Sequence, residues 1–265
     1  SVYQPFGLEV FGQARESASG PGTDLLVYHG STDAPTVDVF ESAAVGGTVI
    51  DDLAYGEFSG YLEAPTLDLV FQVRTADNTA IVAAYQAPLA TLGLEGAALT
   101  VVASGFLDPE NNNDGPAFGL WVATAAGGAL LELPAAPLPA PARVQVIHNS
   151  ADDAAAEVDL YLNGEPLLSG LAFRTATPFV NAPSGVDLNL AVAPANSNSV
   201  DDAVASFTLN LEEAKTYIVV ANGIVVPAGY DPATPFDLYI FDAGRETAAG
   251  DGTDVLVFHG ATDAP

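Results

Sequence analysis

The chain has 265 residues, of which 49% are apolar, and this is enough for about two domains that each have a core. Six Lys and Arg stand against 34 Asp and Glu, a net charge of −28, so a nucleic acid, itself a polyanion, would be repelled. The chain has no Cys, which excludes disulfides, thiolate nucleophiles, thiolate zinc sites and iron–sulfur clusters.

The excess of acidic residues is costly, because uncompensated negative charges repel one another in the folded state unless salt screens them or cations bind. Such a composition is typical of salt-adapted proteins and of plain acidic extracellular proteins, and both interpretations stay open. No stretch is an unbroken apolar 20-mer, so no membrane span is expected. The absence of Met indicates a processed form or a fragment, and we expect an extracellular or cell-surface location.

Internal repetition is the strongest signal in the sequence. Residues 5–35 recur at residues 235–265 with 19 of 31 positions identical and no gap, and residues 25–40 recur in diverged form at residues 144–161. The repeats predict the closing strand of a preceding module plus a linker at 1–23, module 1 at 24–133, a Pro-rich linker at 134–141, module 2 at 142–247 and the opening strand of a following module at 248–265.

The first predicted element in chain order is a closing strand that carries Phe6, Leu8 and Val10. A closing strand without its own module would have an unpaired edge. We therefore expect these side chains to be buried against a neighbouring module or an adjacent subunit, by strand addition. Their counterparts in module 2 should be buried within that module, and they are Phe236, Leu238 and Ile240.

Each module then opens on a histidine, and in all three copies an aspartate follows four residues later. The three copies of this repeat motif are His29 with Asp33, His148 with Asp152, and His259 with Asp263. A metal-binding or catalytic role is one interpretation. Alternation favours another, because His148 shares a strand face with Val144 and Val146 and so points into the core, where it can bond the turn that follows.

A Ser/His/Asp triad can be written from Ser31, His29 and Asp33, but neighbours along a strand point to alternate faces and rarely converge. The chain has no G-x-S-x-G elbow, no H-E-x-x-H motif and no Walker loop. We therefore expect no enzymatic activity and no catalytic residues.

The interiors of both modules contain short strand-like runs separated by Gly, Pro, Asn and Asp. Period-two alternation predicts strands at residues 67–74 and 186–192, and a short apolar run predicts another at 217–221. The main helical candidate is residues 87–96. Strands of this length and spacing indicate an all-β fold with one antiparallel β-sandwich per module.

An oxygen-rich loop at residues 108–115 is a candidate calcium site, because Ca²⁺ takes carboxylate, amide and carbonyl oxygens. The candidate ligands are Asp108, Glu110, Asn111, Asn113 and Asp114. The loop lacks the spacing of an EF-hand, and the matching loop of module 2 does not keep these residues, so an ordinary turn is the alternative. Residues 196–202 have the same two interpretations, and no other cofactor is expected.

Several motifs together resemble a bacterial and archaeal family, the domain of unknown function family 4397. They are HGSTDAPTVDVF and HNSADDAAAEVDLYLNG at the openings, SGLAFRTATPFV at residues 169–180 and YIVVANG at residues 217–223. The resemblance covers nearly the whole chain. It implies secreted, surface-associated, immunoglobulin-like β-sandwich modules, often in tandem, with partial modules at both ends here and no established catalytic residues. Asn149 and the extra residues Asp153 and Ala154 depart from a shared geometry at the two motifs.

Two functions are compatible with this organisation. The preferred hypothesis is a non-catalytic structural module of an extracellular filament, stalk or surface fibre, whose partners are copies of itself or adjacent modules of the same long chain. The alternative is a cell-surface adhesin that binds glycan, protein or a cation through an exposed aromatic or polar cluster. Tyr55, Phe58 and Tyr61 are candidates for such a cluster and are explained equally well by strand packing.

Overall fold

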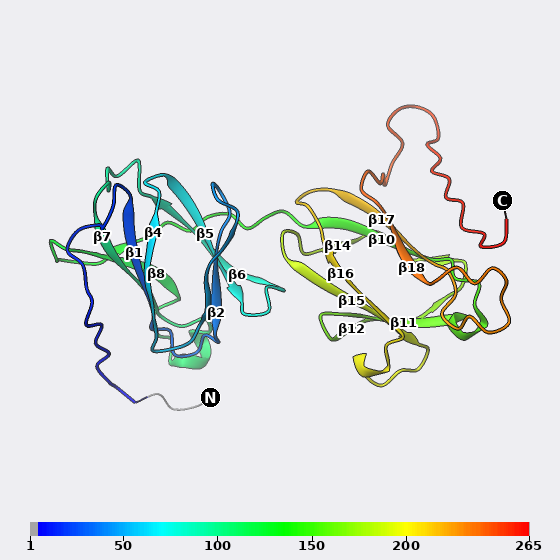
Figure 1. Ribbon diagram of the computed structural model, residues 1–265, viewed down its shortest axis with the longest axis horizontal. Helices are drawn as coiled ribbons and strands as arrows, with labels where there is room; N and C mark the ends of the chain where they lie inside the picture. The colour runs from blue at the N-terminus through cyan, green and yellow to red at the C-terminus, as the bar shows by residue number, and fades with distance from the viewer. Residues whose placement is uncertain (1–4, 265) are drawn as a thin grey trace. The chain divides into compact units, whose positions relative to one another are not determined.

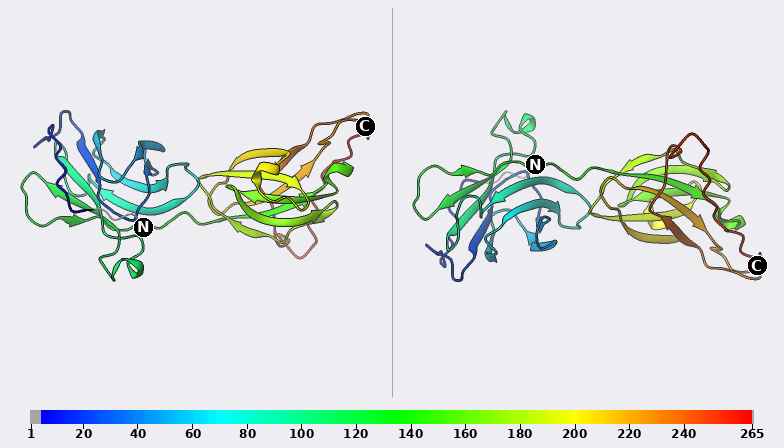
Figure 2. Two further views of the ribbon diagram at one scale, coloured as in Figure 1. Left: turned by 90° about the horizontal axis from the view of Figure 1, so that it is seen from below. Right: turned by 90° about the horizontal axis from the view of Figure 1, so that it is seen from above.

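The computed structural model describes residues 5–264. The chain divides between Leu138 and Pro139 into two compact units, and in each unit the strands form two layers (Figure 1, Figure 2). The predicted fold class, two tandem all-β sandwiches, is confirmed. We call these sandwiches module 1 and module 2. Within residues 5–264 the helices are single 3₁₀ turns, and none has the length to cross a membrane.

Module 1 consists of two sheets with the strand orders β4-β1-β7-β8-β9 and β3-β2-β5-β6 (Figure 1). The strands are β1 Thr23–His29, β2 Val37–Glu41, β3 Gly47–Leu53, β4 Phe58–Ala64, β5 Asp68–Thr75, β6 Ile81–Pro88, β7 Ala98–Ser104, β8 Gly119–Thr124 and β9 Leu131–Glu132. A 3₁₀ turn, η1 Glu110–Asn112, lies in the loop between β7 and β8.

Module 2 has sheets ordered β13-β10-β17-β18, with β14 also on β10, and β12-β11-β15-β16. The strands are β10 Ala142–His148, β11 Glu157–Leu162, β12 Glu165–Ala172, β13 Thr175–Ala176, β14 Val180–Ala182, β15 Asp187–Pro194, β16 Ala205–Asn210, β17 Thr216–Asn222 and β18 Asp237–Phe241. Two 3₁₀ turns complete it, η2 Asp153–Ala155 and η3 Val200–Asp202. The order repeats that of module 1, with β13 and β14 together in the place of β4.

One strand pair in each module is parallel, whereas the sequence predicts antiparallel sheets. The opening strand pairs in parallel with a late strand, β1 with β7 and β10 with β17, and the other pairs in these sheets are antiparallel. No tight turn connects the members of a parallel pair, because five strands lie between β1 and β7 along the chain. Antiparallel pairing is therefore not imposed on them by the connection.

The cores follow the period-two alternation of the strands. In module 1 the inner faces contribute leucines such as Leu25 and Leu69, which are 3% and 2% exposed. In module 2 the corresponding layer contains Leu188 and Val219, at 2% and 1%. Burying one such side chain contributes about 1.5–3 kcal/mol, so each module has the apolar interior that a separate folding unit needs.

The predicted strands at 67–74, 186–192 and 217–221 are confirmed as β5, β15 and β17. The helical candidate at 87–96, expected to form a turn or two, forms turns and no helix. β6 continues to Pro88, and the following residues form tight turns in which the Leu92 N–H donates to the Pro88 carbonyl and the Leu94 N–H to the Leu89 carbonyl. So short a segment, interrupted by proline and glycine, has too little helix propensity to compete with the packing of Leu89, which is 3% exposed.

The N-terminal segment forms no strand in residues 5–11 (Figure 1). Phe6, Leu8 and Val10 are 95%, 85% and 86% exposed. Their burial against a neighbouring module stays a prediction, and in this single chain the segment gives the fibre hypothesis no support of its own.

The counterpart of that segment in module 2 forms β18, which pairs with β17 as expected. The prediction that its apolar residues are buried there is only partly right, because Phe236 and Leu238 are half-buried and Ile240 is 48% exposed. Among the described residues no strand pairs with the other edge of β18, whereas β8 has β9 on that edge. The missing cover explains the exposure of Ile240.

Candidate functional site

The two histidines of the repeat motif lie in the sandwich cores. His29 and His148 are 1% and 0% exposed, as alternation along the strands predicts. The Nε2 atoms lie 3.0 Å from the Pro35 carbonyl oxygen and 2.6 Å from that of Ala155. A carbonyl can only accept, so Nε2 carries the proton in both rings and each histidine fastens the chain that follows it. Burial lowers the pKa of His148, which keeps the ring neutral.

The serine two residues after each buried histidine donates a hydrogen bond to a glycine carbonyl in the loop after the parallel partner strand, β7 or β17. Ser31 Oγ donates to the Gly105 carbonyl at 2.7 Å, and Ser150 Oγ donates to that of Gly223 at 2.6 Å. Both glycines have positive φ, 88° and 102°, and a Cβ on either would lie 2.2 Å from a backbone oxygen. These oxygens belong to Ala117 and Pro235, which lie just before β8 and β18, so only glycine fits where the serine-bound loop passes that segment.

The aspartate of the motif adds further contacts, and we call the histidine, serine and aspartate of each module, with their bonds to backbone groups, the clamp. Asp33 accepts the backbone N–H groups of Leu107 and Asp108 at 3.0 and 2.9 Å, and Asp152 accepts those of residues 225 and 226 at 2.8 and 2.7 Å. Burial alone would raise the pKa of Asp33 and Asp152, but these N–H bonds outweigh it and lower the pKa of both. The repeat motif thus joins the first strand of each module to the loop after its parallel neighbour.

These contacts occupy the polar atoms that a catalytic triad would need. Ser31 Oγ is bonded to Gly105 and lies 3.2 Å from Asp33 Oδ1, while His29 Nε2 is bonded to Pro35. Ser31 and His29 are both almost fully buried, so a substrate could not reach them. The third copy differs, since His259 and Asp263 are exposed on a segment without strands.

A small apolar cavity of about 60 Å³ lies in the core of module 1, and His29 is among the residues that line it. His29 Nδ1 is the one buried side-chain nitrogen or oxygen within residues 5–264 that has no hydrogen-bond partner. Ligand pockets for small organic molecules are typically about 300–1,000 Å³. The cavity is therefore too small for a substrate of that size.

The loop predicted to bind calcium is held by its own hydrogen bonds. Asp108 accepts the N–H and the side-chain amide of Asn111, and Asn112 donates to both Asp33 and the Asp108 carbonyl. The acidic side chains of the loop, Asp108, Glu110 and Asp114, do not all lie within 4.8 Å of one another. Asn113 and Asp114 have positive φ, which Asn and Asp tolerate better than most residues. The structure therefore shows a capped turn, and calcium binding there stays a prediction.

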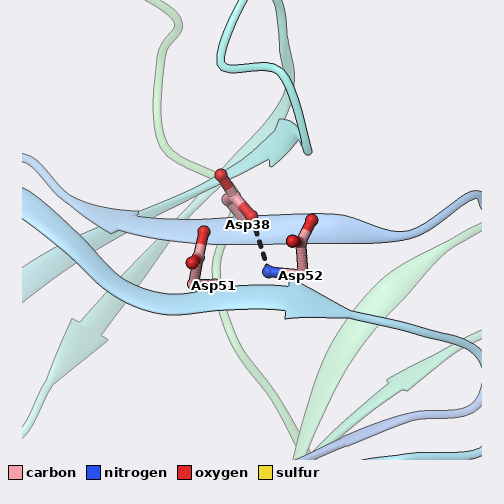
Figure 3. Close-up of side chains that lie close together, drawn as sticks. All are labelled: Asp38, Asp51 and Asp52. Atoms are coloured by element: carbon pink, nitrogen blue, oxygen red, sulfur yellow. Dashed lines mark hydrogen bonds between the residues drawn. The ribbon is translucent and has the colours of Figure 1, made fainter.

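Sequence reasoning missed a different acidic cluster, in which Asp38 of β2 lies beside Asp51 and Asp52 of β3 (Figure 3). Their carboxylate oxygens lie within 4.8 Å of one another, and the Asp52 N–H donates to Asp38 Oδ1 at 2.8 Å. Asp38 is 4% exposed, whereas its two neighbours are exposed. Burial, and then the like charges of Asp51 and Asp52, raise the pKa of Asp38.

Module 2 keeps the buried aspartate and lacks the cluster. Asp159 takes the place of Asp38 in the repeat, and its oxygens accept the Gly170 N–H at 2.8 Å and the N–H and hydroxyl of Ser197 at 3.0 and 2.8 Å. Burial would raise the pKa of Asp159, but these bonds lower it. Ser169 and Gly170 stand where module 1 has Asp51 and Asp52. Comparison of the two repeats could have revealed this difference.

The Asp38 cluster offers three carboxylates of the kind that Ca²⁺ takes as ligands. Asp52 also has a positive φ of 51°, at the position where Gly170 has 69°. A bound divalent cation would relieve the repulsion among the three charges. Without one, the cluster is an acidic surface with one buried member.

The family model for "Domain of unknown function (DUF4397)" matches residues 23–116 and 142–265. The chain belongs to this family. The first matched region covers module 1 from β1 to the loop before β8, and the second begins at β10 and continues past β18. The clamp formed by histidine, serine and aspartate occurs in both. None of the curated proteins compared with the chain matches it.

Solved structures show only a distant likeness. One is a family 26 carbohydrate-binding module of Eubacterium rectale Amy13K in complex with maltoheptaose, at 10% identity and a TM-score of 0.23, covering 84% of this chain and 98% of that one. Another is a proposed cell adhesion protein from Bacteroides ovatus, at 12% identity and a TM-score of 0.18, covering 85% and 98%. Likeness at this level carries no fold or function over to the DUF4397 chain.

Proposed function

We propose that this DUF4397 chain is a non-catalytic structural segment of an extracellular filament, stalk or surface fibre in which modules are joined end to end. The observation that carries the proposal is the repetition of residues 5–35 at 235–265, which places the same connecting sequence before module 1 and after module 2. Each module has its own core, so modules can be added in series without a new fold.

The chemistry of the shared motif supports a structural role. Its histidine, serine and aspartate are buried in both modules, except that Asp33 is half-buried, and they bond to backbone groups. In both modules these residues connect the first strand to the loop after its parallel partner. Such a clamp stabilises each complete module and needs no substrate.

Antibody labelling of intact producing cells tests this proposal. Gold-conjugated antibodies raised against the 265-residue chain should label linear structures that extend from the cell surface at regular intervals. Label confined to the cell interior, or to scattered single points on the surface, would contradict an end-to-end structural role.

A second candidate, a cation-dependent binding module, is favoured by the Asp38 cluster, because module 1 has it and module 2 does not. Isothermal titration of Ca²⁺ into the chain tests it. The double substitution Asp51→Ser and Asp52→Gly gives module 1 the residues of module 2 and should abolish binding at this cluster. Asp108→Asn is the matched variant for the other candidate loop, and equal binding by all three proteins would reject the cluster as a calcium site.

A further inference from the structure

The connecting sequences before module 1 and after module 2 form the same hydrogen-bonded clasp. Arg15 Nη1 donates to Asp24 Oδ2 at 2.6 Å, and 230 residues later Arg245 Nη1 donates to Asp254 Oδ2 at 2.5 Å. The same aspartate oxygen accepts a backbone N–H four residues after each arginine, from Ser19 at 2.9 Å and from Ala249 at 3.0 Å. The repeat is therefore conserved in atomic contacts as well as in sequence.

The clasp does not need a sandwich around it. Asp24 lies in β1 and its side chain is 2% exposed, whereas Asp254 precedes a segment without strands and its side chain is 39% exposed. The pKa of Asp254 is lowered first by the Ala249 N–H and then by Arg245. A contact that forms in both settings is a local property of the connecting sequence.

The first clasp is also attached to the module that follows it. The Arg15 N–H donates to the Tyr61 hydroxyl at 2.7 Å, and the guanidinium lies 4.5 Å above the Tyr61 ring. Ser19 Oγ donates to Glu63 at 2.7 Å. Both Tyr61 and Glu63 belong to β4, the edge strand beside β1.

The second connecting segment is attached to the module that precedes it. Arg143 forms a two-pronged ion pair with Glu246, with Nε–Oε1 and Nη2–Oε2 distances of 2.7 and 2.8 Å. Lys215 lies 3.3 Å from Asp242, and the Gly244 N–H donates to the Thr216 carbonyl. Arg245 and Glu246 thus face different partners although they are adjacent in sequence.

Cations are concentrated at these contacts. The chain has six Lys and Arg, and four of them take part, which are Arg15, Arg143, Lys215 and Arg245. In a chain of net charge −28, carboxylates are available everywhere and cations are scarce. Their placement marks the connecting segment as the part of the surface where specific ion pairing is concentrated.

We propose that residues 12–24 and 242–254 are two views of one docking joint, whose partners are the modules of this family on either side. On this model the clasp fixes the joint itself, an Arg143-like cation holds it to the preceding module, and a Tyr61- and Glu63-like strand edge holds it to the following one. The inference rests on the proposed end-to-end array, and it adds that the connection is a docked element with a defined structure.

Trypsin digestion of the 265-residue chain tests the clasp, because cleavage requires the arginine side chain to leave its partner and enter the protease. Asp254→Asn should accelerate cleavage after Arg245 by about 3-fold to 10-fold, and Asp24→Asn should do the same after Arg15. Arg174, which is exposed, supplies an internal reference, and Asp251→Asn is the matched control beside the second clasp. Because Asp24 is buried in module 1, only an Asp24→Asn protein in which Arg74, a buried arginine of the same module, stays uncut is compared.

A tandem chain, made of residues 1–234 followed directly by residues 5–265, tests docking on both sides. It contains one joint with module 2 before it and module 1 after it. Cleavage at the arginine of that central joint should be at least about 3-fold slower than at Arg15 of the single chain, and Arg143→Gln in the preceding module should remove the difference. Equal rates in the two chains, or no effect of Asp254→Asn, would overturn the joint. Surface labelling reports on the array itself, so a fibre with a freely cleaved joint would reject this inference and leave the proposed function standing.

Discussion

Modules 1 and 2 share a strand order and a clamp. In module 1 another strand pairs with the outer edge of β8, whereas among the described residues no strand pairs with the outer edge of β18, its counterpart in module 2. In module 1, β9 pairs with β8, and residues 134–136 continue across to bond with β6 of the other sheet. Val122 of β8 is 7% exposed, whereas Ile240, its counterpart in β18, is 48% exposed. The same sequence position is thus core or surface according to the segment that follows it.

The buried aspartates give a second comparison. Asp159 has donors on both carboxylate oxygens, while Asp38 has one backbone donor and two acidic neighbours. Two substitutions on the adjacent strand, Ser169 and Gly170 against Asp51 and Asp52, separate a structural hydrogen-bond acceptor from a charged cluster. Matched variants in the two modules can therefore test each difference directly.

The largest effect should come from the closing strands. Leu120→Ala removes a side chain that is 6% exposed and should destabilise module 1 by about 2–5 kcal/mol. Leu238→Ala, at the same repeat position, should cost module 2 less than half as much, because Leu238 is only half-buried. Denaturant unfolding followed by proteolysis of each module gives the two values, and equal costs would show that closure by β9 does not matter.

The aspartate pair should respond in opposite directions. Asp159→Asn places an amide against N–H and O–H donors and should destabilise module 2 by about 1–3 kcal/mol. Asp38→Asn removes a buried charge next to Asp51 and Asp52, and should stabilise module 1 by up to about 1 kcal/mol at neutral pH. The raised pKa sets the sign, because the penalty for ionised Asp38 appears as pH rises through its folded pKa. A loss of stability in both variants would contradict this assignment.

Acid should weaken module 2 through His148. Its folded pKa is lowered by burial, so the unfolded state binds a proton first, and stability falls as pH drops below the unfolded value of about 6.5. The loss at pH 5 should be at most about 2 kcal/mol. His148→Gln should flatten this part of the pH profile, measured by thermal unfolding between pH 5 and 8, and an unchanged slope would assign the titration to other groups.

Added salt should have the smallest effect on stability for each charge that it screens, and it should stabilise both modules. The melting temperature of the chain should rise from dilute buffer to molar NaCl, because screening reduces the repulsion among its acidic side chains. A flat or falling curve would remove salt adaptation as an explanation of the composition.

Much of the fold could be predicted because the repeats and strand alternation are local signals. The positions of β5, β15 and β17 and the inward orientation of His29 and His148 follow from a period of two. The parallel β1–β7 pair could not be predicted in this way, since its partners are far apart in sequence. Residues 87–96 form turns instead of the candidate helix, because their helix propensity is weaker than the tertiary contacts of Leu89.

The site was harder to predict for the same reason. Asp38 and the Asp51–Asp52 pair are ordinary strand residues until β2 and β3 are placed side by side. The loop at 108–115 has the composition of a calcium site, but composition does not show that Asp108 and Asn112 are used in capping the turn and binding Asp33. Arg15 and Arg245 were visible within the repeat, but their shared role depends on the contacts with Asp24 and Asp254.

Imaging of isolated surface fibres by electron cryomicroscopy tests the central claim, that DUF4397 modules are joined end to end, most directly. The reconstruction should show module 1 and module 2 alternating along the axis, with the Arg15 segment docked between consecutive copies. Phe6, Leu8 and Val10 should be buried beside a β17-like strand. Fibres that lack this chain, or that leave these three side chains in solvent, would contradict the account.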